Sequence, residues 1–353
     1  MIVIDGSQGE GGGQVLRTAL TLACLTGQTL QIERIRANRP KPGLRPQHLT
    51  AVHAAAAICG AKMEGDALSS SDLVFVPSRP PEPAEYVFDV AESARHGSAG
   101  SVGLVLQTVI LPLALSGGSS HLTLRGGTHV PWSPSAHYLE HVYLPTLAHM
   151  GVQVTLDLTK WGFYPAGGGE LHVTITGHQG ALQPLVITEP GEIHRVWGTA
   201  AVSNLPAHIP QRMANRAHNV LAESGLDARI EPRRLRGAGP GAGISIFVEC
   251  ANATTGFTAY GRKGLPSEQV AEDACSQLLA HHESGAAVDP HLADQLLLPM
   301  VLAEGRSCVT TSRVSQHLLT NLWVVQRFLK RDAHVEGELG TVGALTIKGD
   351  THD

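Results

Sequence analysis

Cysteine is scarce in this chain, and long apolar runs are missing. The five cysteines stand at positions 24, 59, 250, 275 and 308, and none belongs to a C-x-x-C pair. This scatter indicates reduced thiols and argues against a zinc site. No apolar run approaches the roughly 18 residues that a membrane span needs, and the first residues show no signal-peptide pattern. We therefore expect a cytoplasmic protein with no membrane partner.

A strong charge of one sign is missing too. The net charge of −5 gives the chain no general attraction for nucleic acid, so a polyanion site must be a local basic patch. An apolar fraction of 42% with a charged fraction of 16% is typical of a globular protein rather than a disordered one. With 353 residues, the chain can hold more than one domain.

Glycine is concentrated near the N-terminus. Between Asp5 and Arg17, glycines occupy positions 6, 9, 11, 12 and 13. The segment follows the apolar run 2–4, which predicts a strand, and precedes the helical pattern 15–25. Glycine tolerates positive φ, and backbone N–H groups at a helix start can surround an anion. The run has neither the following Gly-Lys-Ser/Thr of a P-loop nor the spacing of a dinucleotide fingerprint.

One carboxylate, Glu10, lies inside this glycine run. A carboxylate beside a phosphate site is suited to holding a divalent cation between the two. Arg17, one helical turn further on, could reach a phosphate. The alternative interpretation is a plain glycine-rich turn with a solvated Glu10.

Three regions of the chain repeat the order helix, strand, loop, helix. Their first helices are expected to begin near residues 14, 101 and 291. The second interval is longer than the first by roughly the length of a small domain. We therefore predict an α+β fold in which three two-helix units form a large domain, residues 1–182 and 285–353. Residues 183–284 are expected to form a small inserted domain with strands and helices of its own.

The loops at equivalent places of the three regions hold the unusual chemistry, and we expect them to lie on one rim. The first, residues 34–45, carries five cations and is stiffened by Pro40 and Pro42. The second is residues 126–134, and the third is residues 313–317. A basic loop can also be a solvated face. A second basic group in the predicted insertion, at positions 229, 233, 234 and 236, can likewise be a charged surface or a contact for a long polyanion.

His317 opens an apolar helical pattern. A helix N-terminus disfavours protonation, which leaves a neutral imidazole with one nitrogen available as a nucleophile. Since the chain has 19 histidines, the alternative is an ordinary surface or core residue.

With these motifs, the chain resembles the RNA 3′-terminal phosphate cyclases from residue 1 to about 330. The resemblance rests on several segments in the same order: residues 9–17, 41–49, 97–101, 162–169 and 317–321. That family has three copies of a two-helix, four-stranded unit plus a small inserted domain, which agrees with the repeat described above. The resemblance implies that a histidine takes AMP from ATP, passes it to an RNA 3′-phosphate, and that the vicinal 2′-OH then closes a 2′,3′-cyclic phosphate.

By position, the resemblance makes His317 the nucleophile and Glu10 the ligand of Mg²⁺ or Mn²⁺. It implies a nucleotide site that consists of Gln14, Arg17, Gln107, Pro131, His291, Asp294 and Gln295. It implies a substrate-phosphate site that consists of Arg36, Arg39, Lys41 and His48. The family often has an aromatic residue that stacks on adenine near position 291, where this chain has an imidazole, which offers less stacking area.

Two other classes remain as alternatives. The first is a non-catalytic, ribosome-assembly relative of the cyclases, which lacks the nucleophilic histidine; the presence of His317 and Glu10 argues against it. The second is an enolpyruvyl transferase, which also uses repeated two-helix units and binds anions with arginines, but needs no ATP.

Overall fold

The computed structural model describes residues 1–93 and 98–349, and within them the fold is mixed α+β with four four-stranded sheets. This confirms the predicted α+β class. The first sheet has the order β1-β2-β4-β3. Its elements in chain order are β1 (Ile2–Asp5), α1 (Gly13–Thr26), β2 (Leu30–Glu33), α2 (Pro46–Cys59), β3 (Lys62–Glu64) and β4 (Leu73–Val76).

The second sheet has the order β5-β6-β8-β7. Its elements are β5 (Glu85–Asp89), α3 (Val102–Ala114), β6 (Ser120–Gly126), α4 (Ala136–Tyr138), η1 (Leu139–Tyr143), α5 (Leu144–His149), β7 (Val154–Lys160) and β8 (Gly169–Ile175). The sequence pattern of residues 136–150 predicts one continuous helix, but the structure has one π-helical turn, η1, between α4 and α5.

The third sheet has the order β15-β16-β14-β9. Its elements are β9 (Val186–Ile187), α8 (Pro290–Leu302), β14 (Ser307–Thr311), α9 (Gln316–Phe328), β15 (Ala333–Glu336) and β16 (Gly343–Ile347). In each of these three sheets, the first two strands along the chain pair in parallel, and the other pairs are antiparallel.

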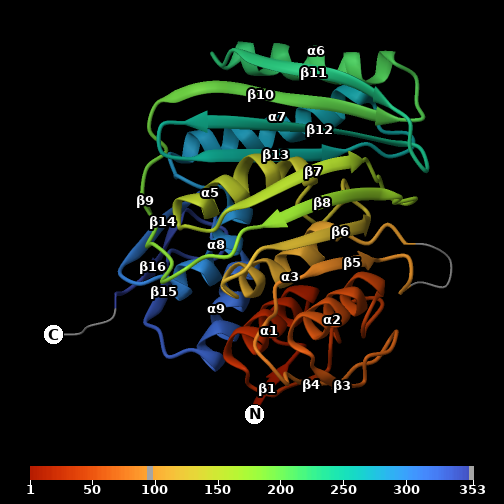
Figure 1. The fold of residues 1–353 in the computed structure, drawn as a ribbon. Helices are drawn as coiled ribbons and strands as arrows, with labels where there is room; N and C mark the ends of the chain where they lie inside the picture. Colours follow the sequence, from red (N-terminus) through yellow and green to blue (C-terminus); the bar gives the residue numbers. More distant parts are fainter. Residues whose placement is uncertain (94–97, 350–353) are drawn as a thin grey trace.

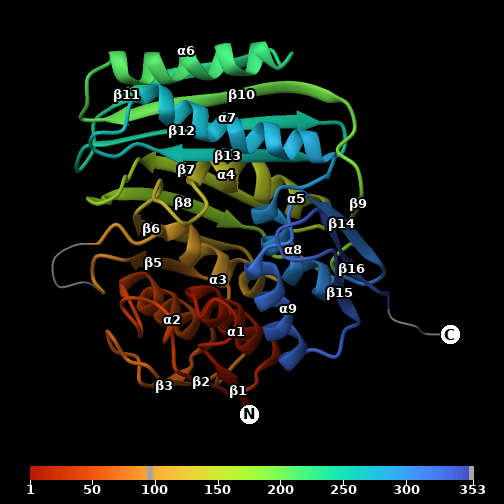
Figure 2. The same cartoon turned by 180° about the vertical axis from the view of Figure 1, so that it is seen from behind.

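The fourth sheet has the different order β11-β10-β12-β13 and lies at the end of the molecule opposite the N-terminus (Figures 1 and 2). Its elements are β10 (Ile193–Ser203), α6 (His208–Glu223), β11 (Ala228–Leu235), β12 (Gly241–Cys250), β13 (Thr254–Tyr260) and α7 (Ser267–Ser284). Apolar side chains of these elements form a separate buried cluster that includes Met213, Ile246 and Leu278.

Helix α1 is buried on nearly all sides and packs against α2, α3 and α9. Its hydroxyls reach out to these neighbours: Thr21 donates to the Thr108 carbonyl of α3 at 2.8 Å, and Thr18 donates to Asn321 of α9 at 2.8 Å. The bond from Thr18 to Asn321 ties α1 to α9. Glu10 lies just before the start of α1, and His317 lies at the start of α9. None of the described helices is long and apolar enough to cross a bilayer.

The sequence pattern of residues 29–36 predicts a strand, but β2 ends at Glu33, because Arg34 and Arg36 take φ values of 55° and 56°. A left-handed backbone cannot continue an extended ladder. The first basic loop therefore begins with two such residues, which turn the chain away from the sheet.

Candidate active site

The glycine run forms a tight turn against α9. Gly9 and Gly11 have φ values of +63° and +57°. A Cβ atom on Gly9 would lie 2.2 Å from the hydroxyl of Thr320, so only glycine lets the turn approach the helix this closely. Helix α1 follows Gly12, which offers no side-chain cap. The first N–H groups of α1 therefore have no side-chain cap and could bind an anion.

Glu10 lies between His317 and Arg39. Its Oε1 is 3.1 Å from the Nδ1 of His317 and 3.2 Å from an Nη2 of Arg39. This oxygen is buried, and neither contact has hydrogen-bond geometry. The His317 side chain is 44% exposed. Because Nδ1 faces the carboxylate, Nε2 is the ring nitrogen available to a substrate.

The surroundings of His317 favour the neutral imidazole. Burial lowers the pKa of His317, and the cations of Arg17 and Arg39 act in the same direction, whereas Glu10 opposes them. Charged imidazolium has no lone pair, so a lowered pKa keeps this group nucleophilic at neutral pH.

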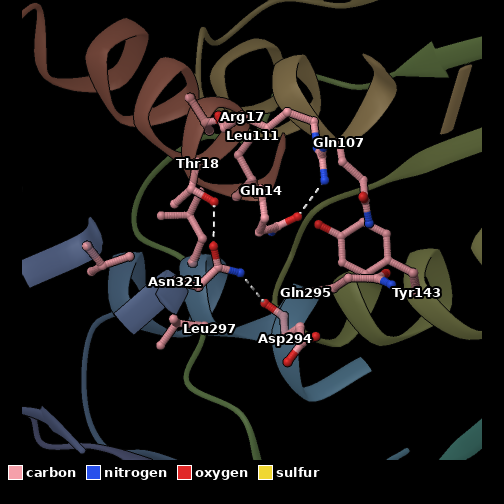
Figure 3. Close-up of a pocket in the computed structure, with 13 residues that line it drawn as sticks. Gln14, Arg17, Thr18, Gln107, Leu111, Tyr143, Asp294, Gln295, Leu297 and Asn321 are labelled. Carbon is pink, nitrogen blue, oxygen red and sulfur yellow. Dashed lines mark hydrogen bonds between the residues drawn. The ribbon is translucent and has the colours of Figure 1, made fainter. Parts of the chain in front are cut away.

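A polar network joins α1, α8 and α9 (Figure 3). Arg17 is buried and donates to the Gln14 amide oxygen at 2.6 Å; burial lowers its pKa to about 10, so it stays charged at neutral pH. Asn321 receives the Thr18 hydroxyl and donates to the Asp294 backbone carbonyl at 3.4 Å. Each buried polar group thus helps to position another.

Ser315 connects this network to His317. Its hydroxyl caps α9 by accepting from the Leu318 N–H at 2.9 Å and also contacts Oδ1 of Asp294. Burial raises the pKa of Asp294 to about 8, with smaller contributions from the nearby carboxylates Asp289 and Glu10. At neutral pH, Asp294 is therefore mostly a protonated acid, which can donate a hydrogen bond as well as accept one.

A cleft of about 400 Å³ opens beside these groups. All seven residues expected at the nucleotide, and His317, line it: Gln14, Arg17, Gln107, Pro131, His291, Asp294, Gln295 and His317. Parts of the second and third expected loops and the start of α1 thus meet at this cleft. The roles of these residues remain predictions.

Sequence reasoning missed part of the wall. The cleft is also lined by Trp132, Tyr138, Thr258, Tyr260 and Gln277. Trp132 belongs to the second loop, which the sequence singled out. The last three belong to β13 and α7, far along the chain from every motif, and no local pattern could have found them.

The four residues expected at the substrate phosphate do not line this cleft. Arg39 lies beside it on Glu10, and Lys41 is exposed on its loop. His48 is 4% exposed, accepts the Arg45 N–H on Nδ1 at 3.3 Å, and packs where a Cβ on Gly13 would be 2.2 Å from its Nε2. Its ring is therefore held against the start of α1.

Arg36 is used by its own loop. Its guanidinium donates to the carbonyls of Lys41 at 2.7 Å and Gly43 at 2.9 Å. In this geometry, Arg36 shapes the loop that carries Arg39 rather than pointing at the cleft.

Glu10 offers a single protein ligand to a metal. Across residues 1–93 and 98–349, no group of three His, Cys, Asp or Glu side chains could hold an ion by itself. The buried Glu10 Oε1 without a hydrogen bond, at the open end of α1, fits an ion whose other ligands are phosphate and water.

The chain matches known proteins over almost its whole length. A sequence model of the family RNA 3′-terminal phosphate cyclase matches residues 8–335. A protein of Nostoc sp. named RNA 3′-terminal phosphate cyclase is 54% identical over 93% of this chain and 94% of its own. Proteins of the same name from Methylococcus capsulatus and Salmonella agona are 52% and 42% identical, over 99% of this chain and 97% and 98% of theirs.

Among solved structures, the enolpyruvyl transferase NikO from Streptomyces tendae is 12% identical, with a TM-score of 0.21 over 96% of this chain and 80% of that one. That score carries no argument about fold or activity. The family match, by contrast, includes every residue that lines the cleft described above. The chain belongs to the RNA 3′-terminal phosphate cyclase family and is an enzyme of that type.

Proposed function

We propose that this enzyme uses ATP to convert the 3′-phosphate end of an RNA into a 2′,3′-cyclic phosphate, with His317 as the nucleophile. The names of its relatives support the overall reaction. The position of His317 supports the mechanism: its Nδ1 is 3.1 Å from Glu10, and Nε2 is left for the cleft.

The proposed reaction has three steps. Nε2 of His317 attacks the α-phosphorus of ATP; a P–N bond forms, and the P–O bond to pyrophosphate breaks. An oxygen of the RNA 3′-phosphate then attacks the same phosphorus, which releases the histidine and gives RNA(3′)pp(5′)A. Finally, the vicinal 2′-OH attacks the RNA phosphorus, loses its proton and expels AMP. Since that hydroxyl is already adjacent, proximity supplies much of the rate of closure.

The charged residues at the start of α1 have a clear task in such a reaction. Transfer of a nucleotidyl group places negative charge on phosphate oxygens. The first N–H groups of α1 and the cations Arg17 and Arg39 would stabilise that charge. A Mg²⁺ or Mn²⁺ ion held by Glu10 would neutralise part of the triphosphate when bound.

The direct test is attachment of labelled AMP to the protein. We expect His317→Ala to remove the label completely, and the exposed His334→Ala to keep it. A P–N bond should break in mild acid and survive alkali. Normal labelling of His317→Ala, or an alkali-labile adduct, would rule out His317 as the nucleophile.

A second test separates activation from closure. RNA with a 3′-phosphate but a 2′-deoxy terminal sugar can accept AMP, yet has no hydroxyl to displace it. We expect RNA(3′)pp(5′)A to accumulate, and RNA that ends in a 3′-OH to give no cyclic end. Cyclisation of the ribose substrate without ATP would exclude the scheme.

The two alternative classes predict different results in the same AMP-labelling experiment. A non-catalytic ribosome-assembly relative would take no label from ATP. An enolpyruvyl transferase would form no nucleotide adduct either, but would consume an enolpyruvyl donor. The labelling experiment on the unmodified enzyme therefore distinguishes the proposal from both.

We also propose a domain organisation for the enzyme. Three sheets share one strand order and pairing, which supports three repeated units in a large domain. The fourth sheet has its own buried cluster, which supports an inserted domain. Since β9 lies at 186–187 and pairs with β14, the insertion proposed over 183–284 should begin after Ile187. We place the enzyme in the cytoplasm, where ATP and reduced thiols are available.

A further inference from the structure

Trp132 is exposed on a loop whose other residues are mostly buried. Its side chain is 94% exposed, whereas Thr128, His129, Val130 and Ser135 are between 1% and 4% exposed. The chain has four tryptophans, and the other three are partly buried. Indole is the largest apolar side chain, so leaving it in water gives up the stabilisation that burial would provide.

The backbone at Trp132 is unusual as well. Its φ is +61°, in the left-handed region that residues with a Cβ rarely adopt. Pro131 and Pro134 stand on either side, and the Ser133 hydroxyl donates to the Val130 carbonyl at 3.0 Å. The loop is thus held in a shape that keeps the indole outside. Backbone strain of this kind concentrates at binding and catalytic sites.

The indole lies on the wall of the cleft that contains His317. Several less exposed groups of that cleft are polar: Asp294, Gln107 and the buried, unpartnered Oε1 of Gln295. They offer hydrogen bonds to one bound nucleotide. Trp132 instead offers a flat apolar face to whatever extends from the cleft into solvent.

An RNA whose end reacts at His317 must extend out of the cleft in this way. Nucleobases are flat and stack on indole faces, and such stacking tolerates any base because every base has a π face. Resting on the proposed function, we propose that Trp132 is a stacking platform for a nucleobase in the 3′-terminal segment of the RNA substrate. On this proposal, the ATP base would bind apart from Trp132, beside the polar groups Asp294, Gln107 and Gln295.

The experiment compares Trp132→Ala with Trp132→Phe. We expect Trp132→Ala to raise KM for a 3′-phosphorylated oligoribonucleotide by about 5- to 150-fold, the loss expected for one base–aromatic stack, with kcat nearly constant. Trp132→Phe keeps a ring and should retain most of the affinity. The KM for ATP in self-adenylylation without RNA should change less than twofold, within the scatter of near-neutral surface changes.

Two further measurements locate the base. An abasic residue placed in turn at the last three positions of the oligonucleotide should raise KM for the unmodified enzyme at one position, with little further loss in Trp132→Ala. Tryptophan fluorescence of the unmodified enzyme should be quenched by the oligonucleotide, and this quenching should be lost in Trp132→Phe although that variant still binds.

Two outcomes would contradict the proposal that Trp132 stacks on an RNA base. A raised KM for ATP with an unchanged KM for RNA would assign the indole to adenine. No change in either would mean an exposed side chain without a ligand. If the unmodified enzyme makes no cyclic ends, the proposed function fails, whereas the fluorescence titration with RNA alone still decides whether Trp132 stacks on a base.

Discussion

Glu10 contacts both the imidazole of His317 and the guanidinium of Arg39, so one side chain serves two tasks. It would hold the metal, and it turns Nε2 of His317 toward the cleft. Removing its charge should affect both tasks in a way that can be measured separately.

We expect Glu10→Gln to slow self-adenylylation and to raise the metal concentration for half-maximal rate at least about tenfold. Since Glu10 is the group that raises the pKa of His317 against burial, the acid limb of the rate should move to lower pH. Labelling with ATP across about pH 5 to pH 8 and a Mg²⁺ titration would measure both effects. Glu336→Gln, a change at an exposed carboxylate, is the control. An unchanged metal titration in Glu10→Gln would mean that Glu10 does not bind the metal.

The raised pKa of Asp294 makes the stability of the folded enzyme depend on pH. Its pKa is raised from an ordinary 3.8 to about 8, so between these values the unfolded chain releases a proton that the folded chain keeps. The contribution of this group to stability therefore falls as pH rises through that window.

Asp294→Asn removes this ionisation and keeps a similar shape. We expect the free energy of unfolding of Asp294→Asn, minus that of the unmodified enzyme, to increase as pH rises from about 4 to about 8, by up to about 1.4 kcal/mol per pH unit. Urea unfolding at several pH values would measure the difference. Parallel curves for the two proteins would mean that Asp294 ionises normally in the folded state.

At the scale of elements, two basic segments compete for the role of phosphate site. The first is loop 34–45, whose Arg39 reaches Glu10. The second is β11, an edge strand whose Arg233 pairs with Glu231 at 2.9 Å and whose Arg234 donates to the Leu205 carbonyl at 2.9 Å. Arg233 and Arg234 therefore already have partners at the surface.

We expect Arg39→Ala and Arg36→Ala to reduce adenylylation or cyclisation strongly, the first by loss of charge at the site and the second by loss of the bonds that shape the loop. Arg233→Ala and Arg234→Ala should only weaken RNA binding, in a salt-dependent way. Steady-state rates and the salt dependence of RNA affinity would rank the four variants. The reverse ranking would assign the phosphates to β11.

At the scale of the whole molecule, buried histidines set the response to acid. His48 and His129 are 4% and 3% exposed. Burial lowers the pKa of both well below the ordinary value, helped by Arg17, Arg36 and Arg45 at His48 and by His137 at His129. In acid, His48 and His129 therefore bind protons in the unfolded chain but not in the folded chain.

We expect stability to fall as pH decreases below about 6.5, by about 1.4 kcal/mol per pH unit for each of these histidines at most. Urea midpoints at about pH 7 and pH 5 would show it. His129→Phe, which can keep the stack on Trp161, should flatten this dependence, whereas the exposed His334→Ala should not. Because Asp294 acts in the opposite direction over this pH range, the comparison with His129→Phe decides the outcome: equal slopes for the two proteins would mean that the His129 ring is charged in the folded state.

The sequence by itself determined what depends on local chemistry. Residues 2–4, the glycine turn and the helix after it form β1, the turn and α1 as expected, because period, glycine content and helix starts are encoded within a few residues. The helices that begin near 101, 291 and 317 are present for the same reason. The sequence pattern did not predict short or charged edge strands such as β3 and β11, because they are strands through pairing with a neighbouring strand and not through their own pattern.

Only the tertiary structure decided which distant groups meet. It places Glu10 against His317, more than three hundred residues away, because α1 packs on α9 and Thr18 bonds to Asn321. It brings Tyr260 and Gln277 of the fourth sheet's elements to the same cleft, directs Arg36 into its own loop, and leaves Trp132 in water. A sequence pattern reports on neighbours within a turn or a strand, whereas these distances depend on the packing of whole helices and sheets.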